Sequence, residues 1–294
     1  MGNKYLIFIY LSVILFLSAC AKELDEAYIA SYIKIDKIEM QTTGAQGSSS
    51  SSLTDAWVYL DGEERGAYPL PSTVPLLEEG AHKIKIAPGI KLNGVAGTRV
   101  PYPLVEPFEA TLDLVKDSIR HLDIECEYYS TTAFAMIEDF EDINFKFETT
   151  NFNTAEWRPT HSSTDPSEYV FEGYHSGGAF MNSKDTVFQV VTKQIFDELP
   201  KQGLPVFIEM DFNVNTTVVL SMTGLEGSMA SEVIVYLSPT NGVWKKIYVN
   251  LTSTISYDTQ GDEYRFQLSA NHTNGDNETI VLIDNFKVLY RDLQ

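Results

Sequence analysis

Apolar and polar residues alternate along most of the chain after residue 27. In the segment 28–40, Ile33, Ile35 and Ile38 are separated by charged residues, and a period of two places such side chains on one face of a strand. Asp61-Gly62 is a hairpin turn signal, and three prolines between residues 69 and 75 exclude a helix there. Further alternating segments lie at 57–60, 82–86, 108–114 and 119–128. This pattern predicts a β-sandwich over residues 27–130.

The same alternation fills the chain from about residue 135 onward. Turn-forming residues separate the segments at 176–178, 239–242 and 274–277, and helix is expected only at Lys193–Leu199. Short strands at this spacing are typical of a jelly roll. The expected strands lie at 145–147, 169–171, 187–191, 207–214, 233–237, 247–251, 264–268 and 280–289. The chain is therefore predicted to be all-β, with a small sandwich followed by a β-jelly roll over residues 135–294.

The first twenty residues differ from the rest. Lys4 precedes an apolar run over residues 5–17, which is short for a membrane-spanning helix and suits the core of a signal peptide. The run ends in Leu-Ser-Ala-Cys at residues 17–20, which resembles the lipobox of bacterial lipoproteins. The resemblance implies that residues 1–19 are removed and that Cys20 carries a diacylglycerol and further acyl chains of the palmitate type, a stable membrane anchor. An ordinary signal peptide with an incidental cysteine is the alternative.

The residues after Cys20 carry a short charged motif. Lys22 is followed by Glu23, Asp25 and Glu26, which resembles the export signal of Bacteroidota-type surface lipoproteins. The resemblance implies that residues 20–26 form a tether and that the protein faces outward from the outer membrane.

The first predicted sandwich contains a recognisable order of features. A strand at 57–60, the Asp61-Gly62 turn, a proline-rich crossing and Gly80-x-His82-x-Ile84 together resemble the PEGA type of small sandwich. The resemblance implies an Ig-like or prealbumin-like topology for residues 27–130. The Gly- and Ser-rich run 44–52 is expected to be a flexible loop inside this sandwich.

Composition narrows the possible partners. The net charge of −20 argues against nucleic acid as a partner, because phosphate binding needs a basic face. There are two cysteines, so a lipidated Cys20 leaves Cys126 without an intramolecular partner. Cys126 lies in an alternating segment and is expected to be a small buried hydrophobe, so the fold must rest on its cores.

Three motifs of the second half belong together. They are Met136–Asp142 near its start, Trp244–Leu251 in its middle and Ile283–Val288 at its end, and they resemble the galactose-binding-like jelly roll of many carbohydrate-binding modules. In that family the first and last strands run side by side, and acidic residues from both often hold a structural calcium ion. The resemblance implies Glu141 and Asp284 as calcium ligands, with Glu138 or Asp139 as helpers. The alternatives are rim carboxylates and, for Asp284, a turn cap.

Aromatic side chains are the candidates for contact with a sugar, because sugar rings stack on their faces. They are Trp157, Tyr169, Tyr174, His175 and Trp244. Each has a core role as its alternative, since most aromatic residues are buried.

One motif calls for a test of catalysis. Glu209 and Asp211 point to one face of a predicted strand, as in the E-x-D-x-x-E signature of laminarinase-like glycosidases. The third acid is missing, because Phe212, Asn213 and Val214 follow, so the proton donor is lacking. We interpret the pair as a solvated face and expect no enzyme.

These observations predict a cell-surface lipoprotein that binds glycan without catalysis. A structural or protein-binding envelope lipoprotein, with other envelope proteins as partners, is the alternative. A degenerate jelly-roll glycosidase is the minor one.

Overall fold

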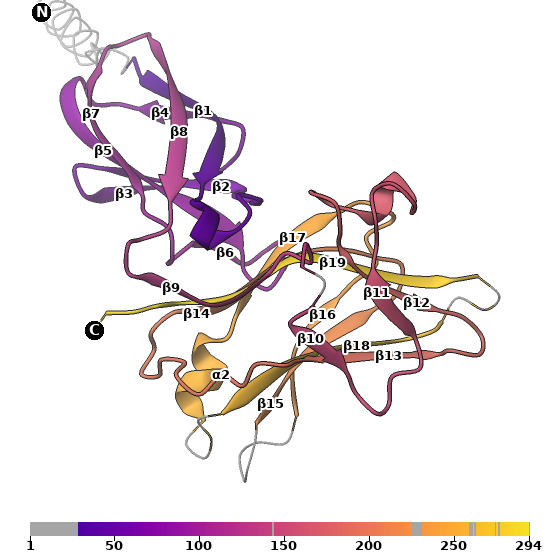
Figure 1. Cartoon of the computed structure of the whole chain (residues 1–294). Helices are drawn as coiled ribbons and strands as arrows, with labels where there is room; N and C mark the ends of the chain where they lie inside the picture. Colours follow the sequence, from indigo (N-terminus) through magenta and orange to yellow (C-terminus); the bar gives the residue numbers. More distant parts are fainter. Residues whose placement is uncertain are drawn as a thin grey trace, which may run out of the picture.

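The computed structural model describes residues 29–293, except 143, 225–230, 259–260, 262, 274 and 276. Cys20, the predicted signal peptide and the predicted tether lie outside the described residues. Within these residues, no helix has the length and apolar character that crossing a bilayer requires. The predicted all-β class is confirmed: two β-sandwiches lie side by side, the first in indigo to magenta and the second mostly in orange to yellow (Figure 1).

Residues 31–127 form the N-terminal sandwich. One sheet has the order β4-β1-β8, with β1 and β8 parallel, and the other has the order β3-β2-β5-β6, with β7 also on β5. The alternating isoleucines of β1 are buried between the sheets, as the period of two predicts. The strands are β1 (Ser31–Gln41), β2 (Asp55–Leu60), β3 (Glu63–Pro69), β4 (Ser72–Leu76), β5 (Gly80–Lys91), β6 (Arg99–Pro101), β7 (Phe108–Leu114) and β8 (Ile119–Glu127). A 3₁₀ turn, η1 (Gly44–Gln46), follows β1.

Residues 132–291 form the C-terminal sandwich. One sheet has the order β10-β13-β18-β15-β16, and the other has the order β11-β12-β19-β14-β17, with β9 also on β19. The strands are β9 (Thr132–Glu138), β10 (Phe147–Thr149), β11 (Glu156–Pro159), β12 (Gly177–Met181), β13 (Val187–Thr192), β14 (Val206–Val214), β15 (Val218–Gly224), β16 (Glu232–Leu237), β17 (Lys245–Asn250), β18 (Tyr264–Asn271) and β19 (Thr279–Arg291). The 3₁₀ turn η2 (Ser167–Tyr169) and the short helix α2 (Thr252–Tyr257) complete it.

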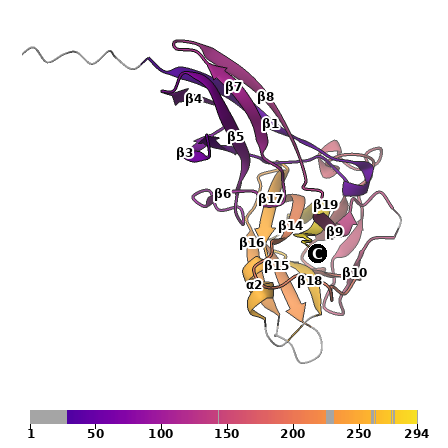
Figure 2. The same ribbon diagram turned by 90° about the vertical axis from the view of Figure 1, so that its left-hand side faces the viewer.

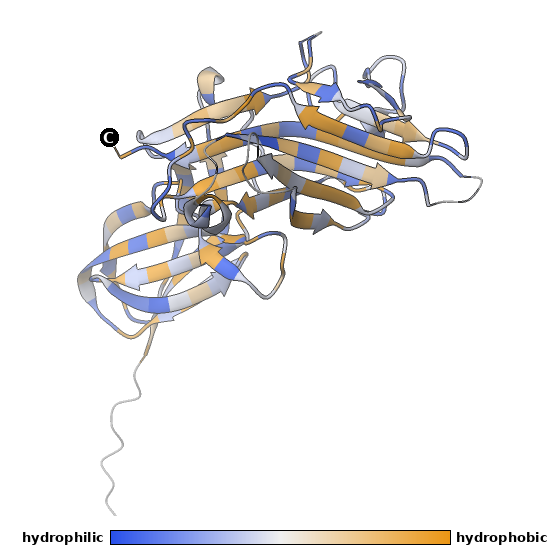
Figure 3. Ribbon diagram, turned by 90° about the horizontal axis from the view of Figure 1, so that it is seen from below, coloured by the Kyte–Doolittle hydropathy of each residue, from blue (hydrophilic) through white to orange (hydrophobic). Residues whose placement is uncertain are grey.

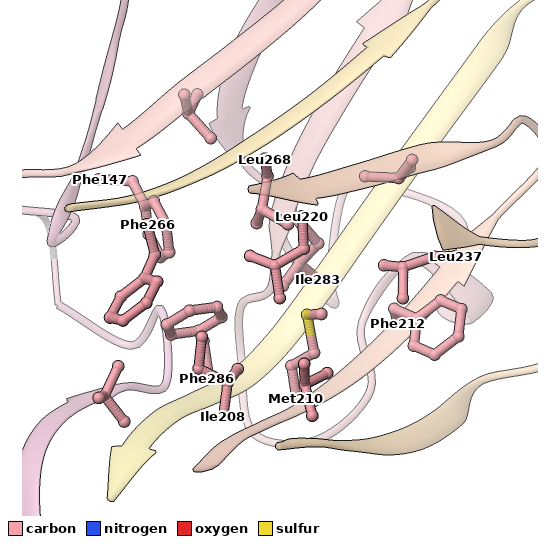
Figure 4. Packing of buried hydrophobic residues seen from close by; sticks show 14 of the residues in the cluster. Phe147, Ile208, Met210, Phe212, Leu220, Leu237, Phe266, Leu268, Ile283 and Phe286 are labelled. Carbon is pink, nitrogen blue, oxygen red and sulfur yellow. The ribbon is translucent and has the colours of Figure 1, made fainter. Parts of the chain in front are cut away.

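Side chains from both sheets fill the core of the C-terminal sandwich. Met210 and Ile283 from β14 and β19 face Leu220 and Leu268 from β15 and β18 (Figure 4). The colouring by hydropathy shows hydrophilic and hydrophobic residues alternating along many of the strands (Figure 3). The prediction that the first and last strands run side by side is confirmed, because β9 pairs antiparallel with β19.

Three local predictions are wrong. Residues 169–171 are not a strand, because η2 ends at Tyr169 and the chain continues as a loop. Gly177 and Gly178 lie inside β12, where missing Cβ atoms leave room for Phe140 and Phe180, and they do not form a turn. No helix forms at Lys193–Leu199, where Phe196 makes an isolated bridge with Tyr264.

The two sandwiches share apolar contacts at their junction. Phe207, Tyr248 and Leu289, from β14, β17 and β19, belong to the same cluster as the core of the N-terminal sandwich. The turned view shows β6 and the end of β5 beside β17 (Figure 2). Burial of this apolar surface opposes rotation of one sandwich on the other.

Cys126 is buried, as the sequence predicts. Burial raises the pKa of its thiol to about 12, which keeps it protonated and unreactive.

Candidate functional site: a pocket between the two sandwiches

A pocket of about 600 Å³ opens at the junction, beside the edge strand β17. Its lining comes from five places that are far apart in sequence. They are the serine run at 50–52, the end of β5 and the loop after it with Asn93, the loop residue Phe171, residues 211–212 of β14, and the region around β16 and β17 with Tyr236 and Trp244. Both sandwiches therefore contribute to one concave surface.

Aromatic rings form one wall of the pocket. Trp244 is half-buried, and its ring centroid lies 5.3 Å from that of Phe171. The Trp244 indole N–H donates to the carbonyl oxygen of Glu168 over 2.9 Å, which holds the ring in place. Tyr236 also lines the pocket and is 63% exposed. A fixed, half-exposed ring in a pocket that an exposed ring also lines is the type of surface on which a sugar ring can stack.

A buried ion pair lies at the floor. Asp211 on β14 accepts hydrogen bonds from the hydroxyl of Ser50 over 2.9 Å and from the side-chain amide of Asn285 over 3.1 Å. The ammonium nitrogen of Lys246 lies 3.3 Å from the same carboxylate. Burial raises the pKa of Asp211, while Lys246 acts in the opposite direction. The floor thus offers a polar surface whose groups already have partners.

Glu209 lies further along β14, below the N-terminal sandwich. It accepts hydrogen bonds from the hydroxyls of Tyr102 over 2.5 Å and Tyr128 over 2.9 Å, and Lys246 is 3.5 Å away. Glu209 and Asp211 are each 1% exposed, so the interpretation of this pair as a solvated face is wrong. Burial under the other sandwich is the physical reason. A glycosidase role would need Glu209 to reach substrate, and this burial opposes it.

The serine run fastens the N-terminal sandwich to the sheet below. Lys287 donates to the carbonyl oxygen of Ser48 over 2.7 Å, and the backbone N–H of Ser52 donates to the hydroxyl of Tyr248 over 2.8 Å. With the Ser50 contact to Asp211, these bonds fix the run in one place. The expectation of a flexible loop is therefore wrong, because polar groups of the other sandwich bind the serines. Its position inside the N-terminal sandwich, between β1 and β2, is as predicted.

The loop after β5 makes a second polar link. The backbone N–H of Asn93 donates to the carbonyl oxygen of Tyr248, and the Asn93 side chain accepts from the backbone N–H of Asn250 over 2.8 Å. Asn93 and Gly94 both have positive φ, a conformation that these two residue types tolerate best. The loop is thereby held against the rim of the pocket.

The two main calcium candidates have hydrogen-bonding roles in the structure. Glu141 accepts from the backbone N–H groups of residues 174 and 175 over 2.8 and 3.0 Å. Asp284 accepts from the hydroxyl of Ser176 over 2.6 Å and from the backbone N–H of Asn285 over 2.8 Å. Burial raises the pKa of Asp284 to about 8, so the carboxyl is largely protonated at neutral pH in the folded chain.

The two helper candidates are also engaged. Glu138 accepts from the backbone N–H groups of Phe140 and Lys146, and Asp139 accepts from the backbone N–H two positions on. Within the described residues, no three His, Cys, Asp or Glu side chains gather in an arrangement that fits a metal ion. Calcium binding stays a prediction, and the contacts seen favour local structural roles for these carboxylates.

Trp157 packs inside the C-terminal sandwich. Its ring lies 5.4 Å from that of Phe188, 5.5 Å from Phe145 and 6.0 Å from Phe140, measured between centroids. This placement favours the core role over contact with a ligand.

The other three aromatic candidates lie on the loops before β12, outside the pocket lining. Tyr169 packs against Phe180, with centroids 5.9 Å apart, and His175 binds the carbonyl oxygen of Thr160 over 2.9 Å. Tyr174 is 68% exposed. Of the five sequence candidates, Trp244 lines the pocket.

Sequence reasoning missed most of the residues that surround Trp244. Phe171 is predicted on a strand, Ser50 lies in a run that is expected to be flexible, and Lys246 lies in the Trp244–Leu251 motif without being singled out. Asn93 and Tyr236 belong to no recognisable motif. No local pattern marks these residues as one site, because they come together only in the folded structure, where the two sandwiches meet.

Comparisons with known proteins identify no family. No family model matches the chain, and no curated protein matches it. Several solved β-sandwich carbohydrate-binding modules align with part of it. A family 22 module of Clostridium thermocellum Xyn10B is 13% identical over 54% of this chain and 94% of that chain, with a TM-score of 0.38. A family 61 module solved with β-1,4-galactotriose is 12% identical over 52% of this chain and 94% of that chain, with a TM-score of 0.35.

A third match, from a study of carbohydrate-binding modules of the β-sandwich superfamily, covers more of the chain. It is 13% identical over 79% of this chain and 84% of that chain, with a TM-score of 0.35. Likeness at this level assigns no ligand and no residue role to this chain. The case for function therefore rests on the pocket itself.

Proposed function

We propose that this protein binds glycan without catalysis, in the pocket between its two sandwiches. The observation that carries the proposal is the fixed, half-exposed ring of Trp244 in a pocket that Tyr236 and a floor of polar groups also line. Sugar recognition commonly combines a stacking ring with a few placed polar groups. The hydrogen-bonded junction supports this role, because a preorganised site loses less entropy when ligand binds.

We further propose that the chain acts at the outer surface of a bacterial outer membrane, held by lipid on Cys20. The lipobox-like residues 17–20 and the charged residues that follow support this. Mass spectrometry of the chain extracted from membranes tests it. The proposal predicts an N-terminal acylated cysteine at position 20, and an unacylated N-terminus would contradict it.

Glycan-array screening, followed by affinity electrophoresis of the purified chain, tests the binding proposal. Trp244→Ala removes the stacking ring, and we expect it to weaken affinity about tenfold or more, equivalent to about 1.4 kcal/mol. Tyr174→Ala is the matched control, since it removes another exposed aromatic ring outside the pocket. Equal affinity of both variants and the wild type would contradict the pocket assignment. Absence of binding to every glycan would contradict the function.

A protein-binding envelope role is the second candidate. The edge strand β16 supports it, because Val233 and Tyr236 are 45% and 63% exposed there. Exposed apolar residues gathered on an edge strand are typical of contact surfaces. Cross-linking in intact cells separates the two candidates: a stoichiometric protein partner that protects β16 would favour this role.

A further inference from the structure

The pocket differs in charge from the chain as a whole. The chain has 41 acidic and 21 basic residues, not counting histidine. The pocket lining nevertheless contains three lysines, Lys91, Lys245 and Lys246, and a single carboxylate, Asp211. An acidic protein thus gathers cationic side chains where a ligand would sit.

Two of these lysines are available to a ligand. The third, Lys246, is not available to a ligand, because its side chain is 3% exposed and lies between Glu209 and Asp211. Lys91 and Lys245 have no ion-pair partner in the part of the chain that the structure describes. Lys245 is exposed and Lys91 is half-buried.

The two free lysines come from different sandwiches. Lys91 ends β5 of the N-terminal sandwich, and Lys245 begins β17 of the C-terminal sandwich. The hydrogen bonds of Asn93 hold the end of β5 against β17, so both lysines line the same pocket. An ammonium group binds a carboxylate or a sulfate through charge-assisted hydrogen bonds, which are stronger than those to a neutral hydroxyl.

We infer that the ligand is an anionic glycan, with one sugar ring on Trp244 and an acidic substituent held by Lys91 and Lys245. This inference rests on the proposed function and specifies its ligand class. The substituent is a carboxylate or a sulfate ester, which share the chemistry that these lysines recognise.

The net negative charge of the chain affects how its binding to a polyanion must be measured. The whole protein repels a polyanion, while the pocket lysines attract it at short range. Salt weakens both effects, so ionic strength alone does not separate them. Charge-matched variants do, and each variant must be compared with its own mobility in a gel without polymer.

Affinity electrophoresis of the purified chain at neutral pH uses two matched polymer pairs. Polygalacturonate is compared with neutral galactan, and dextran sulfate with dextran. We expect stronger retardation by at least one anionic polymer than by its neutral counterpart. Retardation by polygalacturonate alone identifies a carboxylate, and retardation by dextran sulfate alone identifies a sulfate.

The double variant Lys91→Gln/Lys245→Gln should lose at least tenfold in affinity for the anionic polymer. Lys184→Gln/Lys193→Gln removes the same charge outside the pocket lining and should bind as the wild type does. Lys91→Arg/Lys245→Arg keeps the charge and should also bind, which separates loss of charge from loss of folding.

Three outcomes would overturn the inference. The first is that neutral and anionic polymers retard the wild-type chain equally and that the double variant is retarded as much as the wild type. This result would contradict the inference and leave the proposed function standing. Equal losses in the double variant and in the Lys184/Lys193 control would show that overall charge, and not the pocket, causes binding. Retardation by none of the four polymers would also overturn it, and the glycan array would then decide the proposed function separately.

Discussion

The hydroxyl of Tyr102 provides a sharp test of the junction. Tyr102 follows β6 in the N-terminal sandwich and donates over 2.5 Å to Glu209 in the C-terminal one. Its ring also packs edge-on against Phe207 and Tyr248, with centroids 5.4 and 4.9 Å apart. Tyr102→Phe keeps this packing and removes only the hydroxyl.

The expected cost follows from the burial and charge of the acceptor. A hydrogen bond to a charged group contributes about 1.5–3 kcal/mol. Burial and the nearby carboxylate of Glu209 raise the pKa of Tyr102 well above its usual range, so the phenol remains a donor at neutral pH. The second donor, Tyr128, and Lys246 remain near Glu209 in the variant. We therefore expect Tyr102→Phe to lower the free energy of unfolding by about 2 kcal/mol.

Urea denaturation followed by tryptophan fluorescence measures this change, since Trp57 and Trp157 report on different sandwiches. Tyr59→Phe is the matched control, because its half-buried hydroxyl makes no hydrogen bond with the described residues, and it should cost less than about 0.5 kcal/mol. A double-mutant cycle with Glu209→Gln should give a coupling of about 1–2 kcal/mol. Equal costs for Tyr102→Phe and the control, together with no coupling, would refute the assignment of this hydrogen bond.

Two further predictions concern the C-terminal sandwich. Burial raises the pKa of Asp284 to about 8, so the folded chain keeps a proton that the unfolded chain loses near pH 4, and the free energy of unfolding falls as pH rises from about 4 to 8. Asp284→Asn should flatten this fall by at least about 1 kcal/mol between pH 5 and pH 8 in urea titrations, and an unchanged slope would contradict the assignment. Gly177→Ala should lower the free energy of unfolding by about 1–3 kcal/mol, because the added Cβ would lie 2.6 Å from ring atoms of Phe140 and Trp157. Gly97→Ala meets no atom within 4 Å and has no positive φ, so it controls for the loss of a glycine and should cost less.

The sequence was most informative where one face of a strand is buried. β7 begins and ends at the predicted residues, and β18 begins at the predicted Tyr264, because alternation reports burial on one side directly. It was least informative at β12. β12 is buried along its whole length and begins with two glycines, so its residues were read as a turn.

The site was predictable only in part, for a related reason. Trp244 could be singled out because aromatic rings near a recognisable motif are few. The environment of Asp211 could not be foreseen, since its burial depends on Ser50, which is 161 residues away. The sequence around Asp211 contains no information about Ser50, and the sequence around Ser50 contains none about Asp211.

A crystal structure of the chain with a bound oligosaccharide tests the central claim most directly. The oligosaccharide would be taken from the polymer that retards the wild-type chain most. Our account predicts a sugar ring stacked on Trp244, in the pocket bordered by Ser50 and Asn93 from one sandwich and Tyr236 from the other. A sugar bound elsewhere, for example at the loop that carries Tyr174, would contradict it.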